Sequence, residues 1–143
     1  MNEAFLIHYY YGDRYSTFRA GLGAIIRAKG QSLKIQAILI NDSFSWISNL
    51  KLLNDINAVI FDLSHYKATL DAIKKNIVFS EKSMLLVVNF DLLIENNLLS
   101  LEKFIDLILD KNKKTEIVLT GETEYSQLVK LADYASNFKL VKN

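Results

Sequence analysis

Two hydrophobic patterns alternate along the chain. Short, nearly continuous apolar runs are separated by longer stretches in which apolar residues recur every three or four positions. The runs are typical of strands buried in a parallel sheet, and the longer stretches are typical of amphipathic helices. The predicted strands are residues 4–11, 34–40, 57–63, 84–90, 115–120 and 138–141, and the predicted helices are 17–29, 46–53, 66–77, 101–108 and 123–134.

The order of these elements predicts the fold class. A strand is followed by a helix five times in succession, which is typical of an α/β protein. We therefore expect a three-layer α/β/α arrangement, in which helices cover both faces of a mostly parallel sheet of five to six strands. The chain shows no internal repeat and no linker, so residues 1–143 are expected to form a single domain.

Composition narrows the class of protein. The 143 residues carry 17 Lys and Arg against 16 Asp and Glu, half are hydrophobic, and there is no Cys and no Pro. So apolar a chain is expected to collapse rather than stay disordered, and without Cys it can form neither disulfides nor thiolate zinc sites. The balanced charge argues against nucleic acid as the main partner. The absence of a signal-like N-terminus or a long apolar segment predicts a cytoplasmic protein without membrane contact.

The loop after the first predicted strand is the strongest candidate for a ligand site. In open parallel sheets ligands bind at the carboxyl ends of strands, and residues 12–16 are predicted to form a loop between the first strand and a helix. The small residues Gly12, Ser16 and Thr17 would let an anion approach the helix N-terminus, and Arg14 could reach it. The same layout is also that of an ordinary strand-to-helix turn, and the strict pattern G-x-x-x-x-G-K-[ST] is absent.

Four segments, in order along the chain, resemble the P-loop type of ATP:corrinoid adenosyltransferases. Residues 23–30 resemble that family's G-x-A-x-R-A-x-G, 98–102 resemble its LLDLEE, and 116–121 resemble its VVLTG. Residues 131–135, followed by 139–142, resemble its LADLVTEM…VKH. The resemblance implies a P-loop NTPase-like fold, ATP and Mg²⁺ as cofactors, a corrinoid substrate and a homodimer.

The resemblance also implies a register for the phosphate loop. The family's T-G-N-G-K-G-K-T-T falls on residues 11–19, so Gly12 keeps its glycine. Thr17 takes the place of the lysine that meets the triphosphate, and Phe18 takes the place of the threonine that holds Mg²⁺. Arg14 or Arg19 would have to restore the positive charge. The implied nucleotide and phosphate loop comprises Gly12, Asp13, Arg14, Tyr15, Ser16, Thr17 and Phe18.

Two strand ends compete for the family's acidic metal position. Asp62 ends a segment that resembles the local family sequence VVLD, whereas spacing to Thr120 favours Asp91, with Phe90 in the place of a second acid. Asp91 is therefore the candidate metal ligand. The further pocket candidates are Arg19, Arg27, Asp62, His65, Asp91, Thr120 and Gly121.

Three functions remain open at this stage. The first is ATP-dependent transfer of an adenosyl group to a cob(I)alamin-type corrinoid, which the replacements at Thr17 and Phe18 predict to be weak. The second is a non-catalytic binding or assembly protein on the same scaffold, with a nucleotide or corrinoid as ligand. The third is a flavodoxin-like protein that binds FMN, with the turn at Ser16 and Thr17 around the flavin phosphate.

Overall fold

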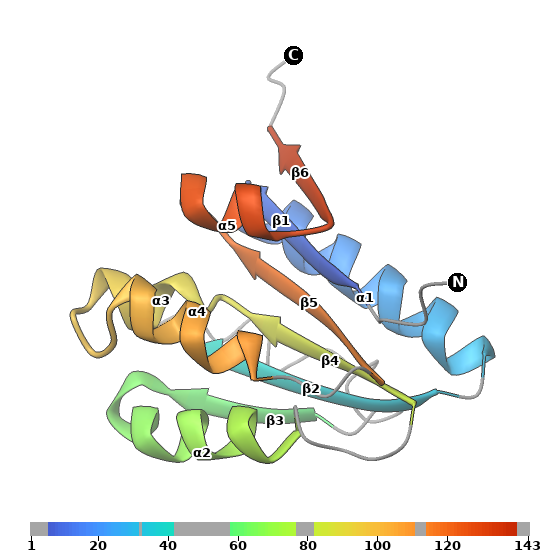
Figure 1. The fold of residues 1–143 in the computed structure, drawn as a ribbon, viewed down its shortest axis with the longest axis horizontal. Coiled ribbons are helices and arrows are strands. Elements are labelled where there is room, and N and C mark those ends of the chain that lie inside the picture. The colour runs from blue at the N-terminus through green and yellow to red at the C-terminus, as the bar shows by residue number, and fades with distance from the viewer. Residues whose placement is uncertain (1–5, 32, 42–57, 77–81, 111–113, 140–143) are drawn as a thin grey trace.

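The chain folds around one six-stranded parallel sheet. The computed structural model describes residues 6–31, 33–41, 58–76, 82–110 and 114–139. Within these residues the strand order is β3-β2-β4-β5-β1-β6, and every neighbouring pair runs parallel (Figure 1). The strands are β1 (Ile7–Gly12), β2 (Lys34–Asn41), β3 (Ala58–Asp62), β4 (Ser83–Val88), β5 (Thr115–Gly121) and β6 (Tyr134–Phe138). The helices are α1 (Arg14–Gly30), α2 (Tyr66–Asn76), α3 (Asp91–Glu95), α4 (Leu101–Leu109) and α5 (Ser126–Leu131), with a short 3₁₀ turn at Leu63–His65.

Helices cover both faces of this sheet. Among the described elements, α1 lies on one face, where Phe18 and Ile25 pack against Leu86 and Val118. The helices α2, α3, α4 and α5 lie on the other face and bury Phe90, Phe104 and Leu128, among others. The predicted three-layer α/β/α class, consistent with a P-loop NTPase-like fold, is confirmed, and the sheet has six strands that are all parallel.

The flavodoxin-like alternative fails on the strand order. That fold places its first strand between the second and the third. Here β1 lies between β5 and β6, and β2 lies between β3 and β4. The FMN-binding alternative, which depended on that topology, is therefore wrong.

The first strand is buried on one face only, contrary to the expectation from its apolar sequence. Ile7 and Tyr9 are fully buried, whereas His8 and Tyr10 on the opposite face are half-buried. The strand lies next to the edge of the sheet, so its second face has less cover than that of the central β4, which is buried throughout. Sequence alone could not give this position in the sheet.

Two segment boundaries near the sheet edge differ from prediction. The helix expected over 123–134 is limited to Ser126–Leu131, and the last strand is Tyr134–Phe138 rather than 138–141. The cause is Asp133, whose carboxylate accepts a hydrogen bond from the Ile7 amide (2.8 Å) and whose own amide donates to the Ile7 carbonyl (2.9 Å). These two bonds attach the chain to β1 before a longer helix can form.

A second set of differences follows β4, which ends at Val88 rather than at residue 90. Asn89 adopts a left-handed conformation (φ 65°), and the short helix α3 follows where a loop was expected. The helix predicted over 46–53 lies outside the described residues, as do parts of the strands predicted over 4–11, 57–63 and 138–141 and the end of the helix predicted over 66–77.

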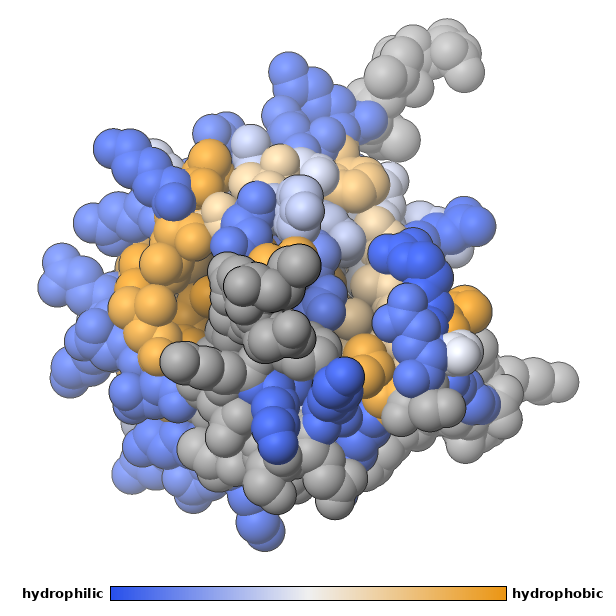
Figure 2. All heavy atoms as spheres, turned by 45° about the vertical axis from the view of Figure 1, so that its right-hand side comes forward, coloured by the Kyte–Doolittle hydropathy of each residue, from blue (hydrophilic) through white to orange (hydrophobic). Residues whose placement is uncertain are grey.

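The surface of the described residues carries both hydrophilic and hydrophobic side chains. Figure 2 shows hydrophilic side chains around the periphery of one face and a patch of hydrophobic surface on its left. Among the helices that are described, none combines the length and the apolar composition that crossing a membrane requires. The exposed large hydrophobic residues are Tyr15, Ile26, Val59, Ile60, Leu109 and Tyr134.

Gly12 joins β1, β6 and α1, and its replacement should destabilise the protein. Its φ of 123° is unfavourable for any other residue, and an added Cβ would lie 2.2 Å from the Phe138 carbonyl oxygen. We expect Gly12→Ala to lower the free energy of unfolding by about 2–3 kcal/mol in urea titrations. Gly30→Ala is the matched control, since nothing lies within 4 Å of its added Cβ. Equal losses in both variants would contradict this account.

Candidate functional site at the carboxyl ends of the central strands

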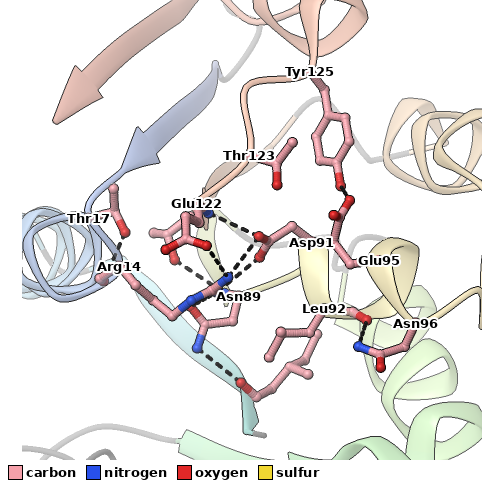
Figure 3. Close-up of polar contacts among 12 residues, drawn as sticks. Arg14, Thr17, Asn89, Asp91, Leu92, Glu95, Asn96, Glu122, Thr123 and Tyr125 are labelled. Atoms are coloured by element: carbon pink, nitrogen blue, oxygen red, sulfur yellow. Dashed lines mark hydrogen bonds and ion pairs between the residues drawn. The ribbon is translucent and has the colours of Figure 1, made fainter. Parts of the chain in front are cut away.

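Arg14 is at the centre of a polar cluster at the carboxyl ends of β1, β4 and β5. Its guanidinium donates to the Asn89 side-chain oxygen (2.8 Å) and, through both Nη atoms, to the two oxygens of Asp91 (3.1 and 2.9 Å). Glu122 lies further away, at 3.9 Å. Figure 3 shows the Arg14 side chain directed from the start of α1 toward these groups. Arg14 was predicted to reach a bound anion, and in the structure its partner is the carboxylate of Asp91.

The Asp91 carboxylate accepts three hydrogen bonds although its side chain is almost inaccessible. Its side chain is 1% exposed, and besides Arg14 it accepts a hydrogen bond from the Glu122 amide (3.0 Å). A buried carboxylate needs this kind of compensation, because desolvation without a partner is costly. Gly121 allows the approach, since an added Cβ there would lie 2.9 Å from an Asp91 oxygen. The chain thus brings the predicted residues Arg14, Asp91 and Gly121 together.

Asn89 fixes the turn that carries Asp91, and sequence reasoning did not select it. Its side-chain amide donates to the Ile40 carbonyl (3.1 Å), and its backbone amide donates to the Thr120 carbonyl (2.9 Å). Asn tolerates the left-handed backbone found here better than most residues. Asn89 therefore connects β2, β4, β5 and Arg14. A polar residue directly after the apolar run of β4 was the available signal.

The N-terminus of α1 is capped by the chain's own carboxylate. Asp13 accepts hydrogen bonds from the Ser16 amide (2.8 Å) and the Ser16 hydroxyl (2.7 Å), and these bonds lower the pKa of Asp13. The expected loop over 12–16 is therefore wrong, because the helix begins at Arg14. Asp13 places negative charge at the helix end that would otherwise attract an anion.

Thr17 and Phe18 lie inside the protein. Thr17 is fully buried, and its hydroxyl donates to the Arg14 carbonyl (3.0 Å). Phe18 is 1% exposed and belongs to the core between α1 and the sheet. Neither side chain is presented to a ligand at the strand ends.

A shallow hollow of about 430 Å³ lies beside the polar cluster. Gly12, Asp13, Glu122, Asn137, Phe138 and Lys139 line it. Its charged side chains are thus two carboxylates and one ammonium group. This lining is less favourable to a polyphosphate than the cation-rich lining that such a ligand requires.

A second hydrogen-bonded group supports the segment after β5. The Tyr9 hydroxyl donates to the Thr123 carbonyl and accepts from the Tyr125 amide (3.1 Å). Figure 3 shows the next bond of this group, which the Tyr125 hydroxyl donates to Glu95. Burial raises the pKa of both tyrosines, so both hydroxyls remain protonated donors at neutral pH. This group holds Thr123, the residue after Glu122, in place.

The other predicted candidates lie elsewhere. Asp62 and His65 are exposed at the end of the edge strand β3, where Asp62 accepts from Ser64 and from the His65 Nδ1, and its pKa is lowered by these contacts. Arg27 is in the last turn of α1, at the opposite end of the helix from Arg14. Arg19 lies over the Tyr15 ring, 5.6 Å from its centroid, on the outer side of α1. The described residues contain no group of three or more His, Cys, Asp or Glu side chains arranged for a metal ion.

The fold is that of an open parallel α/β protein, consistent with a P-loop NTPase-like scaffold. In such sheets ligands bind at the carboxyl ends of the strands, which is where the polar cluster lies. A sequence model of the ATP:corrinoid adenosyltransferase BtuR/CobO/CobP family matches residues 57–143, which is more than half of the chain, and the chain belongs to this family. No curated protein matches the chain significantly.

The family match covers one part of the polar cluster and leaves out the other. It includes Asp91, Thr120 and Gly121 and the strands β4, β5 and β6, whereas Arg14, Thr17 and Phe18 lie before it. The register of residues 11–19 on the family's phosphate loop therefore depends on the sequence resemblance alone.

Proposed function

We propose that this member of the family is a non-catalytic binding or assembly protein whose phosphate site is filled by its own side chains. The observation that carries the proposal is the Arg14 guanidinium, which bonds to both oxygens of the buried Asp91. In the family an acid in this position is expected to bind Mg²⁺. Here the charge of Asp91 is already neutralised by Arg14. The residues present do not fit a Mg²⁺ ion.

The N-terminus of α1 supports the same proposal. The carboxylate of Asp13 accepts hydrogen bonds from the Ser16 amide and hydroxyl. A triphosphate at this helix end would therefore meet a negative charge that belongs to the chain itself. Thr17 and Phe18, at the positions that the resemblance gives to lysine and threonine, are buried and supply neither a cation nor a hydroxyl to the hollow. Each such electrostatic group usually contributes about 10²-fold or more to a reaction of this kind.

The second candidate, adenosyl transfer, is favoured by family membership. In that reaction the reduced cobalt of a corrinoid attacks the 5′ carbon of ATP, a cobalt–carbon bond forms, and triphosphate leaves. Adenosyl transfer requires ATP, whereas in the first candidate the chain's own side chains occupy the phosphate site, so binding of MgATP distinguishes the two candidates.

A thermal-shift experiment with MgATP tests the proposal. A ligand present at 100 times its Kd stabilises a protein by about 2.7 kcal/mol, which corresponds to several degrees of Tm at this chain length. We expect a shift below about 1 °C with millimolar MgATP, because Arg14 and Asp13 occupy the phosphate positions. Equilibrium dialysis against hydroxocobalamin then measures the corrinoid separately.

The control is an authentic corrinoid adenosyltransferase under the same conditions, which should be clearly stabilised by MgATP. A shift of several degrees in the present protein, together with formation of a cobalt–carbon bond from ATP under reducing conditions, would overturn the proposal in favour of adenosyl transfer.

A further inference from the structure

Asp62 and His65 form a hydrogen-bonded pair that lies outside the polar cluster around Arg14. Asp62 is the last residue of β3, and His65 is the last residue of the 3₁₀ turn that leads into α2. The Asp62 Oδ1 atom accepts hydrogen bonds from the His65 Nδ1 (2.8 Å) and from the Ser64 amide (3.0 Å). The side chains of Asp62 and His65 are 56% and 67% exposed, so the pair is accessible to a ligand.

The carboxylate determines which nitrogen of the imidazole is free. An ionised carboxylate can only accept, so Nδ1 carries the proton and the neutral ring keeps its lone pair on Nε2. The Ser64 hydroxyl, and after it the His65 ring, lower the pKa of Asp62, which keeps this acceptor ionised. Within the described residues, the hydrogen bonds of the His65 ring involve Nδ1 and leave Nε2 without a partner. A histidine that a carboxylate orients in this way is a common metal ligand.

The backbone of His65 is held at the start of α2. The hydroxyl of Thr69, a fully buried residue, donates to the His65 carbonyl (3.2 Å). The imidazole thus lies at a junction of strand and helix and not on a long loop. Ligating atoms on such regular elements are placed more precisely than those on loops.

The sheet places this pair on the same edge as the polar cluster. β3 is the outermost strand of the described sheet, beside β2 (Figure 1). Asp62 pairs with Asn41 of β2, and Leu39, two residues earlier in β2, pairs with Val88 at the end of β4. Asp62 is therefore level with the residues just after β4, two interstrand spacings or roughly 10 Å away. Ligands of open parallel sheets bind along this edge.

A single free imidazole nitrogen suits a metal whose other positions are already filled. A free Zn²⁺ ion takes four ligands in proteins, and the described residues contain no group of three or more His, Cys, Asp or Glu side chains arranged for a metal ion. In a macrocycle the ring nitrogens occupy the equatorial positions, so one axial histidine is enough, as in haem proteins. A corrinoid is a macrocycle of this kind with cobalt at its centre. Membership of a corrinoid-dependent family favours it over haem.

We propose that His65 Nε2 is an axial ligand to the cobalt of a bound corrinoid, and that Asp62 is a positioning residue for the imidazole. Nε2 gives its lone pair to a cobalt–nitrogen bond, one water molecule leaves the cobalt, and the oxidation state of the metal does not change. The inference rests on the proposed function, since it takes a corrinoid as the ligand of a binding protein, and it adds the atom that holds the metal.

Electron paramagnetic resonance of the protein with cob(II)inamide tests this ligation. Cobinamide has no nucleotide base of its own, so a nitrogen on the axial position comes from the protein. We expect the cobalt lines to show a triplet splitting from ¹⁴N, which becomes a doublet in protein labelled with ¹⁵N-histidine. His65→Ala should lose the splitting and raise the Kd for cobinamide, measured by visible titration, by about tenfold or more.

Asp62→Ala separates positioning from ligation. The variant keeps the ligating nitrogen but removes the carboxylate that orients the ring and fixes its tautomer. It should retain the nitrogen splitting and raise the Kd for cobinamide by about tenfold. An unchanged Kd would show that Asp62 does not position His65.

His8→Gln is the matched control, because the chain has two histidines and this variant removes the other one. His8 Nε2 is bonded to Glu116 (2.5 Å), so the splitting and the Kd should stay as in the wild type. Circular dichroism checks the fold of each variant, and the isotope label decides without any substitution.

Three results would overturn the inference: a wild-type protein that does not retain cobinamide, a bound cob(II)inamide without nitrogen splitting, or a splitting that survives His65→Ala. The proposed function fails by a different observation, namely strong stabilisation by MgATP with formation of a cobalt–carbon bond. The two failures are therefore distinguishable, since the nitrogen splitting is measured without nucleotide.

Discussion

Replacing Arg14 with alanine should lower the free energy of unfolding by about 3–5 kcal/mol, because it leaves the carboxylate of Asp91 buried without its cation. The Arg14 side chain is 19% exposed and that of Asp91 1%, so water can compensate the lost partner only in part. Asn89 loses a donor in the same variant. Urea unfolding followed by circular dichroism measures the loss.

Two further variants separate the ion pair from a general effect on α1. Arg19→Ala removes an exposed arginine from the same helix and should cost at most about 1 kcal/mol, the usual value of an exposed cation–π contact. Arg14→Met combined with Asp91→Asn removes both charges and keeps an acceptor for the Glu122 amide. This double variant should recover most of the stability. If Arg14→Ala costs no more than Arg19→Ala, Arg14 does not compensate Asp91.

Phe18→Thr should cost about 3–5 kcal/mol, although it introduces the residue type that the resemblance expects at this position. Phe18 is 1% exposed and packs between α1 and the sheet, so the shorter side chain leaves a cavity and buries a hydroxyl. The variant should also gain no stabilisation from MgATP, since position 18 faces the core and not the hollow. Urea unfolding with and without MgATP measures both results.

Ile26→Thr is the control for this change. Ile26 is on the same helix but 57% exposed, so its replacement should change the free energy of unfolding by no more than about 0.5 kcal/mol. A well-folded Phe18→Thr protein that MgATP stabilises by several degrees would show that position 18 can serve the nucleotide, and the proposed function would then be wrong.

Much of the fold follows from hydrophobic patterning. The apolar run of β4 and the amphipathic spacing of α4 are local signals, and both elements lie where they were predicted to within about two residues. Boundaries that depend on distant contacts were not predictable. Asp133 ends α5 early because it pairs with Ile7, which is 126 residues away in the sequence.

The candidate site was predictable in part. The strand-end rule brought Arg14, Asp91, Thr120 and Gly121 to the same region, as expected for parallel strands. It could not give their partners, because a guanidinium at this edge can face either a phosphate or a carboxylate. Asn89 was missed because Asn is common in ordinary turns. Glu122 was missed because it bonds to Asp91 through its backbone amide, which the residue type does not reveal.

The sequence by itself determined the alternation of strands and helices, the neutral and cysteine-free composition and the resemblance to the adenosyltransferase family, since these depend on residue type and spacing. The tertiary structure decided that Arg14 neutralises Asp91, because this pair depends on which strand ends meet. It also decided that β6 forms the edge of the sheet. Strand order is set by packing between distant segments, and no local pattern records it.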